Sequence, residues 1–216
     1  VHNMTNNSTT IRVAALQPPL QWLQSMPNMH LLRQTCEQAV REYSPNLLVL
    51  PEAFNGMPCE FDDGAAGRQA RQFLATLAKA CRVYVIGGSI EYQDNDGTRR
   101  NACFVLDPEG NEVGRYDKRV LFDRELETRK RGTWAGVFDL AGVRVGVLIC
   151  GDLWDPALAR ELHGQADLLC VPAKSGVPTD RNVDYAREMW WNLALTRSVE
   201  NALPVVVSDW ASARHD

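Results

Sequence analysis

Three polar side chains that together could carry out acyl transfer each follow a stretch that reads as a β-strand. They are Glu52, Lys118 and Cys150, and the cysteine, for example, directly follows the apolar run 145–149. Because strand ends in open α/β sheets meet at one crevice, we expect the three side chains to lie close together. A thiol beside a carboxylate and an ammonium suits nucleophilic acyl transfer.

Each of the three residues also has an ordinary structural interpretation when it is taken alone. A cysteine that ends an apolar run usually belongs to the core. A glutamate just after a strand usually faces solvent or begins a helix, and a lysine within a charged cluster is usually one surface charge among several. The functional interpretation therefore depends on the sequence that surrounds all three.

That surrounding sequence resembles the nitrilase-like superfamily of carbon–nitrogen hydrolases. The resemblance covers residues 11–210 and rests on five ordered motifs, which are LLVLPEAF around Glu52, GRYDKRVLFD around Lys118, VGVLICGD around Cys150, ADLLCVP at 166–172 and RSVENALPVVV at 197–207. It implies that Cys150 is the nucleophile, Glu52 the general base and Lys118 the cation that stabilises the oxyanion. The backbone N–H of Gly151 is expected to share this last role.

The resemblance implies hydrolysis of a non-peptide C–N bond in a small linear amide or carbamoyl compound. The reaction would pass through a cysteine thioester and release ammonia or an amine. Thiol, base and cation account for this chemistry, so no cofactor and no metal are expected. A nitrilase acting on a C≡N group is the alternative within the same enzyme class, because the same three residues serve both reactions.

Two further positions are candidates for the site. The resemblance implies a second glutamate that positions substrate or catalytic groups, and both Glu125 and Glu127 are available. Counting back seven residues from Gly132 selects Glu125. Trp154 is a candidate for substrate binding, although it could equally pack against the protein.

The chain departs from the family pattern at three places. Gly151 stands where members more often have an aromatic residue or asparagine, and we expect its missing side chain to open the pocket wall. The basic loop 128–131 replaces aromatic residues, and it could attract a substrate that carries a carboxylate or simply be solvated. Members usually continue with one more hairpin and strand, so the C-terminal part is expected to be short. An inactive scaffold or subunit is therefore a further alternative, and it belongs to a different functional class.

Strand and helix patterns alternate along the chain, which indicates an α/β domain. The predicted strands are 11–16, 47–50, 83–90, 102–106, 112–116, 136–140, 143–149, 167–171 and 204–208, and the predicted helices are 28–43, 69–81, 156–163 and 185–201. The resemblance implies a four-layer α-β-β-α sandwich with two mixed sheets. We expect a single domain over 11–210, preceded by a polar tail at 1–10.

Composition and charge limit the classes of partner and the cellular compartment that we expect for this protein. A net charge of −4 and a pI near 5.6 argue against a nucleic-acid partner, and no apolar run reaches the roughly 20 residues that would span a bilayer. The six cysteines form no CxxC pair and the four histidines have no ligand-like spacing. We therefore expect reduced cysteines, no zinc and a cytoplasmic protein. The resemblance implies a homodimer or larger homo-oligomer.

Overall fold

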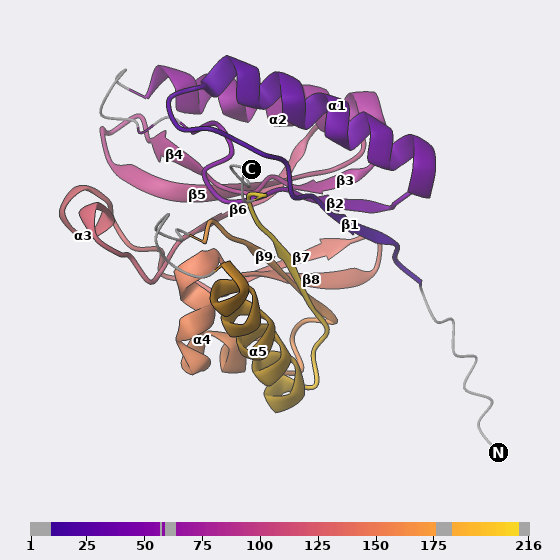
Figure 1. The fold of residues 1–216 in the computed structure, drawn as a ribbon, viewed down its shortest axis with the longest axis vertical. Helices are drawn as coiled ribbons and strands as arrows, with labels where there is room; N and C mark the ends of the chain where they lie inside the picture. Colours follow the sequence, from indigo (N-terminus) through magenta and orange to yellow (C-terminus); the bar gives the residue numbers. More distant parts are fainter. Residues whose placement is uncertain (1–9, 57, 59–63, 176–182, 212–216) are drawn as a thin grey trace.

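Two β-sheets lie face to face in the computed structural model, and helices cover the outer face of each sheet (Figure 1). One outer layer is formed by α1 (Ser25–Tyr43) and α2 (Ala65–Cys81), and the other by α4 (Pro156–Glu161) and α5 (Val183–Asn201). The structure describes residues 10–56, 58, 64–175 and 183–211. The predicted four-layer α-β-β-α sandwich is confirmed.

The first sheet combines parallel and antiparallel pairs. Its parallel strands are β1 (Val13–Ala15), β2 (Leu47–Val49) and β3 (Tyr84–Ile86). The long strand β5 (Arg99–Leu106) pairs in antiparallel fashion with three others, which are β3, β4 (Ile90–Gln93) and β6 (Glu112–Asp117). The hairpin of β5 and β6 therefore extends a parallel core at one side of the sheet.

The second sheet has the strand order β10-β9-β8-β7. Its members are β7 (Gly136–Leu140), β8 (Val143–Val147), β9 (Leu168–Pro172) and β10 (Val205–Ser208). The pairs β10–β9 and β9–β8 are parallel, while β7 and β8 form an antiparallel hairpin. Both sheets are mixed, as predicted.

The strand β2 shows why the fold needs apolar residues on consecutive positions. Leu47 and Val49 point into the core between the sheets, whereas Leu48 and Leu50 point into the core under the helices. All four side chains are fully buried. Side chains alternate between the two faces of a strand, so an unbroken apolar run is what a strand covered on both faces requires.

The two long helices over the first sheet each bury one face. In α1 the buried side chains include Met29, Leu32 and Cys36, and in α2 they include Leu74 and Leu77. The three- and four-residue spacing places each set on one side of its helix. Within the described part of the chain, no helix is both long and apolar enough to cross a membrane.

Several predicted boundaries are shifted, and α1 and α2, for example, begin three and four residues earlier than predicted. The structure also differs from the predicted elements in three further places. The predicted strand 83–90 is divided into β3 and β4 by a turn at Gly87–Ser89, and the short helix α3 (Arg124–Thr128) and the 3-10 helix η2 (Cys150–Trp154) occupy segments predicted as loops. Neither helix is long enough to show a clear apolar period. Of the predicted tail 1–10, only Thr10 lies within the described residues.

The turn that divides β3 from β4 supports the segment that contains Glu52. The N–H of Ser89 donates to the carbonyl oxygen of Pro51 at 3.3 Å, and the N–H of Ala53 donates to the hydroxyl of Ser89 at 3.2 Å. Gly88 makes this approach possible, because its φ is +61° and a Cβ there would lie 2.2 Å from the Pro51 oxygen. The turn thus fixes both neighbours of Glu52.

We predict that Gly88→Ala lowers the free energy of unfolding by about 3–5 kcal/mol, because left-handed strain adds to a backbone clash. Gly142→Ala is the matched control, since Gly142 has a φ of +85° but a Cβ placed there would meet nothing within 4 Å. Strain alone should cost that variant about 1–2 kcal/mol. Urea unfolding measures both, and equal losses would show that the contact with Pro51 is unimportant.

Candidate active site

The three residues singled out by type and position meet where strands of both sheets end. Glu52 follows β2 and Lys118 follows β6 in the first sheet, while Cys150 follows β8 in the second. The backbone N–H of Glu52 donates to the carbonyl oxygen of Ala173 at 3.1 Å, and Ala173 lies just after β9. This bond joins the strand ends of the two sheets directly beside the site.

The ammonium of Lys118 lies at the centre of the site. Its Nζ is 2.7 Å from Oε1 of Glu52 and 2.9 Å from Oε2 of Glu125. Lys118 and Glu52 are only 4% and 5% exposed. Burial opposes the charge of Lys118, but the negative groups around it, Glu52 first, outweigh burial and raise its pKa. Lys118 is therefore a permanent cation.

A residue that the sequence analysis did not single out holds the two carboxylates in place. The side-chain Nδ2 of Asn101 donates to Oε1 of Glu52 at 2.9 Å and to Oε1 of Glu125 at 2.7 Å. Its backbone carbonyl oxygen also accepts a hydrogen bond from the backbone N–H of Lys118 at 2.9 Å. The hairpin register places it there, since Ala102 pairs with Asp117 and Asn101 therefore lies opposite Lys118.

The structure brings Glu125, and not Glu127, to Lys118. Glu125 lies in α3, where its N–H donates to the carbonyl oxygen of Phe122 and its Oε2 accepts from the N–H of Phe122 at 3.2 Å. The side chain of Glu127 is exposed, on the same short helix. Two residues further along this helix the carboxylate no longer faces the pocket.

Cys150 begins the helix η2 with a φ of +44°. Its Sγ is 3.9 Å from the carbonyl oxygen of Lys174. Burial raises the pKa of the thiol well above its usual value, the charge of Glu52 raises it further, and Lys118 only partly opposes them. Lys118 favours the thiolate, but burial and Glu52 outweigh it, so Cys150 rests as a protonated thiol that needs a base.

The carboxylate of Asp152 ties η2 to the segment that contains Lys118. Its two oxygens accept four hydrogen bonds, from the N–H groups of Ile149 at 2.9 Å, Arg119 at 3.0 Å and Val120 at 2.6 Å and from the hydroxyl of Tyr116 at 2.8 Å. Asp152 is fully buried. It thereby fixes the end of β8 relative to the end of β6, which sets the position of the thiol relative to the ammonium.

Gly151 does not open the pocket wall, so that expectation is wrong. The ring of Phe122 lies against its Cα, and a Cβ on Gly151 would be 1.9 Å from Cε2 of that ring. Phe122 is also in cation–π range of Lys118, whose Nζ is 5.9 Å from the ring centroid. The space left by the missing side chain is filled by an aromatic ring from another segment.

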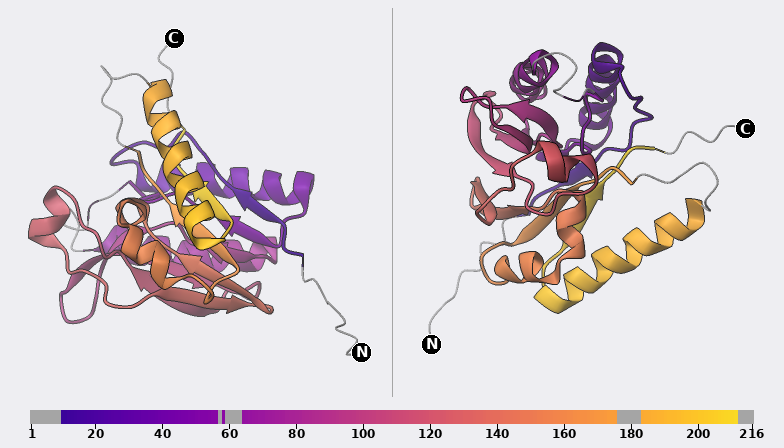
Figure 2. Two further views of the ribbon diagram at one scale, coloured as in Figure 1. Left: turned by 90° about the horizontal axis from the view of Figure 1, so that it is seen from below. Right: turned by 90° about the vertical axis from the view of Figure 1, so that its left-hand side faces the viewer.

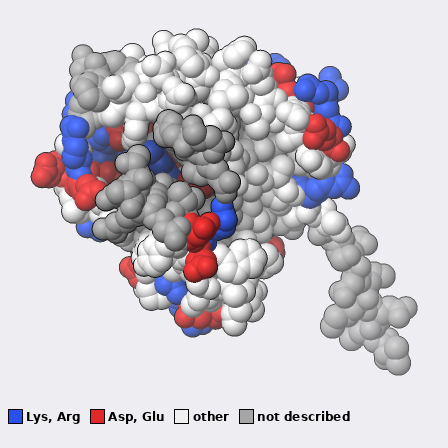
Figure 3. All heavy atoms as spheres, in the orientation of Figure 1, with Lys and Arg blue, Asp and Glu red and all other residues white. Residues whose placement is uncertain are grey.

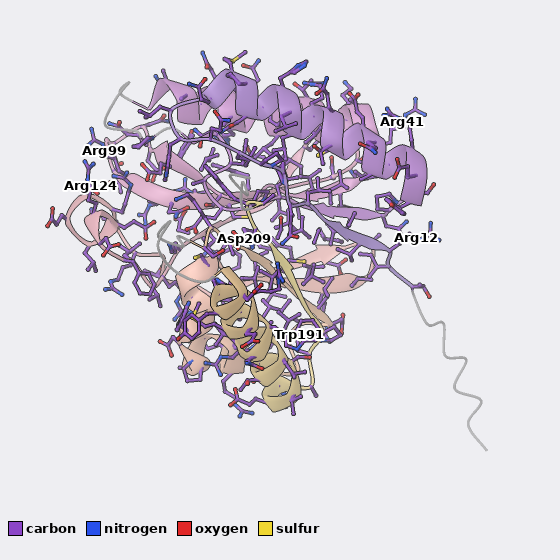
Figure 4. All side chains as sticks on the ribbon, in the orientation of Figure 1. Arg12, Arg41, Arg99, Arg124, Trp191 and Asp209 are labelled. Carbon is purple, nitrogen blue, oxygen red and sulfur yellow. The ribbon has the colours of Figure 1, made fainter. Side chains whose placement is uncertain are left out.

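A pocket of about 510 Å³ opens at this point. Its lining includes Glu52, Lys118 and Glu125 together with charged and aromatic neighbours, among them Trp22, Glu91, Asn101, Phe122, Arg124, Arg129 and Lys174. Acidic and basic side chains gather on this side of the molecule, on the left of Figure 3 and around the labelled Arg124 in Figure 4.

Two candidates stand apart from that lining. Cys150 borders the pocket through its contact with Lys174. Trp154 is half-exposed and packs edge-on against Trp190 of α5, with ring centroids 6.3 Å apart, and it is not one of the lining residues. Within the described residues, no group of three or more His, Cys, Asp or Glu side chains is placed to bind a metal ion.

Known proteins resemble this chain in sequence and in fold. The omega-amidase NIT2-B of Xenopus laevis is 28% identical to this chain, and the match covers 88% of this chain and 72% of that protein. Human omega-amidase NIT2 is 32% identical, and the match covers 79% of this chain and 63% of that protein. The crystal structure of Saccharomyces cerevisiae Nit3, a nitrilase-superfamily member, superposes with a TM-score of 0.82 at 25% identity over 95% of this chain and 78% of that one. The carbon-nitrogen hydrolase family model matches residues 12–213. The chain therefore belongs to the carbon-nitrogen hydrolase family.

Proposed function

We propose that the chain hydrolyses the C–N bond of a small linear amide, with Cys150 as nucleophile, Glu52 as general base and Lys118 as oxyanion stabiliser. The observation that carries this proposal is the buried ammonium that contacts two carboxylates at 2.7 and 2.9 Å beside a thiol. Relatives named omega-amidase support the choice of an amide over a nitrile.

In the first half of the reaction, Sγ of Cys150 bonds to the carbonyl carbon while the thiol proton passes to Glu52. A base is required because burial keeps the thiol protonated. The carbonyl oxygen becomes negative as the tetrahedral intermediate forms. Glu52 then gives its proton to the leaving nitrogen, the C–N bond breaks, and ammonia or an amine departs from a thioester.

In the second half, water attacks the thioester carbon and gives a proton to Glu52. A second tetrahedral intermediate collapses with cleavage of the C–S bond, and the proton returns to the sulfur. The acid leaves and the thiol is restored. Each proton that Glu52 accepts is returned within the same half-reaction, so no external acid or base is consumed.

Lys118 and the backbone N–H of Gly151 support the negative oxygen in both halves. Lys118 is a permanent cation in a buried setting, where charge stabilisation is stronger than in water. Gly151 lies in the first turn of η2, where backbone N–H groups have no partner within the helix. Glu125 and Asn101 position the ammonium and the base rather than react with substrate.

We also propose that a second copy of the chain covers α5, giving a homo-oligomer. Trp191, Leu195 and Val199 recur at four-residue spacing on this helix and are 70%, 50% and 74% exposed. Figure 2 shows α5 at the outside of the molecule, and Figure 4 labels Trp191 on it. An exposed apolar stripe of this kind is typical of a protein interface.

A cytoplasmic location completes the proposal. The five cysteines within the described residues are all free thiols, which suits a reducing compartment. A disulfide found in protein isolated from cells would argue against it.

We predict that Cys150→Ala lowers ammonia release from a panel of small linear amides and carbamoyl compounds by at least about 10³-fold. Cys81→Ala removes another buried thiol outside the pocket and should retain activity. Initial ammonia rates measure both. A folded wild-type protein that is silent on every amide, carbamoyl compound and nitrile would contradict the proposal and favour a scaffold role, whereas turnover of nitriles alone would identify a nitrilase.

Glu52→Gln should separate the effect of the Glu52 charge on the thiol pKa from the role of Glu52 as the general base. Its charge raises the pKa of Cys150, so removing it lowers that pKa and shifts the pH midpoint of iodoacetamide alkylation downward. Amide hydrolysis should nevertheless fall by about 10²–10⁴-fold because the base is lost. Glu127→Gln, an exposed charge nearby, should change neither quantity. An unchanged or higher alkylation midpoint in Glu52→Gln would sink the assigned electrostatics.

Trp191→Glu should convert the oligomer to a monomer at micromolar concentration, because it places a charge in the apolar stripe. Val113→Glu introduces the same charge at another half-exposed apolar position, on β6, and should leave the assembly intact. Sedimentation velocity distinguishes the species. A wild-type protein that sediments as a monomer would refute self-association through this face.

A further inference from the structure

Lys174 places a second ammonium beside the nucleophile. The residue follows β9 and lines the pocket, and its own carbonyl oxygen is the group 3.9 Å from Sγ of Cys150. The backbone of Lys174 therefore lies directly beside the sulfur of Cys150. The charged end of its side chain interacts electrostatically with both Glu52 and Cys150, so it lies on the same side of the pocket as the reacting groups.

Two tryptophan rings hold this ammonium. Its Nζ is 4.1 Å from the ring centroid of Trp22 and 5.2 Å from that of Trp210. The indole N–H of Trp210 donates to the carbonyl oxygen of Glu52 at 2.7 Å, and the two ring centroids are 5.6 Å apart. The aromatic pair is thus tied to the segment that supplies the base, and it places the cation relative to that segment.

The charge of Lys174 has no carboxylate partner among the residues that the structure describes. Asp209, which follows β10, is engaged by the N–H and hydroxyl of Ser175 and by the N–H of Trp210. Glu52 is engaged by Lys118. Burial lowers the pKa of Lys174, and nearby negative groups only partly offset it. A half-buried cation that has no ion pair within the described part of the chain is ready to accept an anion.

The basic loop 128–131 does not supply this charge. Its one pocket-lining member, Arg129, forms an ion pair with Glu91. Lys130 is exposed and lies outside the pocket lining. The basic loop is therefore a weaker candidate for binding a substrate carboxylate than Lys174, which follows β9.

We propose that Lys174 is the specificity-determining residue of the pocket and that it binds a carboxylate carried by the amide substrate a few bonds from the scissile C–N bond. This inference rests on the proposed function. The ammonium makes a charge-assisted hydrogen bond to the carboxylate, while the exposed face of Trp22 packs against the intervening carbon chain. Uncharged amides of the same shape lack this contact and bind more weakly.

The test compares two amides of matched shape, succinamate and 4-methylpentanamide, in which an isopropyl group replaces the carboxylate. Wild type should favour succinamate in kcat/KM. Lys174→Met removes the charge but keeps an unbranched side chain, and it should lower kcat/KM for succinamate by about 10–100-fold, mainly through KM. The value for 4-methylpentanamide should change by less than about threefold.

Three further variants keep the outcome interpretable. Lys174→Arg retains the charge and should retain most of the succinamate preference. Trp22→Leu removes one of the two rings around the Lys174 ammonium and should reduce the preference for succinamate by less than Lys174→Met does. Lys130→Met removes a charge of the basic loop and should have no effect, and circular dichroism verifies that each variant is folded.

The possible outcomes distinguish failure of the proposed role of Lys174 from failure of the proposed amide hydrolysis. Equal turnover of both amides by wild type, or a Lys174→Met variant that loses both activities equally, would overturn the role of Lys174 while leaving Cys150-dependent hydrolysis intact. If Lys130→Met abolished the preference for succinamate, the carboxylate would bind to the basic loop, and the inference about Lys174 would be overturned. If wild type hydrolyses neither these amides nor the wider panel, it is the proposed function that fails.

Discussion

Burial of the Lys118 ammonium between two carboxylates is the constraint on which the site depends. An ion removed from water costs several kcal/mol unless its partners are in place, and leaving one partner unpaired in the interior costs about 3–5 kcal/mol. Glu52, Glu125 and Asn101 come from three separate segments, after β2, within α3 and within β5. The first sheet, its terminal hairpin and α3 must therefore assemble together.

The same charges explain why Cys150 rests as a thiol. Two carboxylates already face one ammonium, so a thiolate would be a further buried negative charge. In the proposed mechanism, the proton leaves the sulfur only when negative charge can move onward to a substrate oxygen near Lys118. Charge is thus displaced within a preorganised group and is not created in an apolar interior.

Much of the fold and the centre of the site could be predicted from the sequence because they depend on local patterns. Apolar runs such as 47–50 identify strands, and the polar residue after each run identifies where chemistry can occur. The proximity of Glu52, Lys118 and Cys150 was predicted and is present in the structure, and Glu125, which counting back from Gly132 selected, also contacts Lys118. The turn at Gly88 was missed because its cause is a contact with Pro51, nearly forty residues away in sequence.

The residues that could not be predicted act through contacts between distant segments. Asn101 looks like an ordinary strand residue until the hairpin register sets it opposite Lys118. Lys174 looks like a surface lysine until Trp22 and Trp210, from widely separated parts of the chain, meet around it. Neither residue has a distinctive spacing from the catalytic positions, so only the tertiary structure assigns it to the pocket.

The contact between Phe122 and Gly151 links two positions that are 29 residues apart, and it restricts how the pocket can diverge. A side chain gained at 151 must displace the ring of Phe122, and loss of the ring alone leaves a void beside Cys150. Single substitutions at either site therefore pass through an impaired intermediate. The two positions should vary as a pair across related sequences, and a library that aims to reshape this pocket should randomise them jointly.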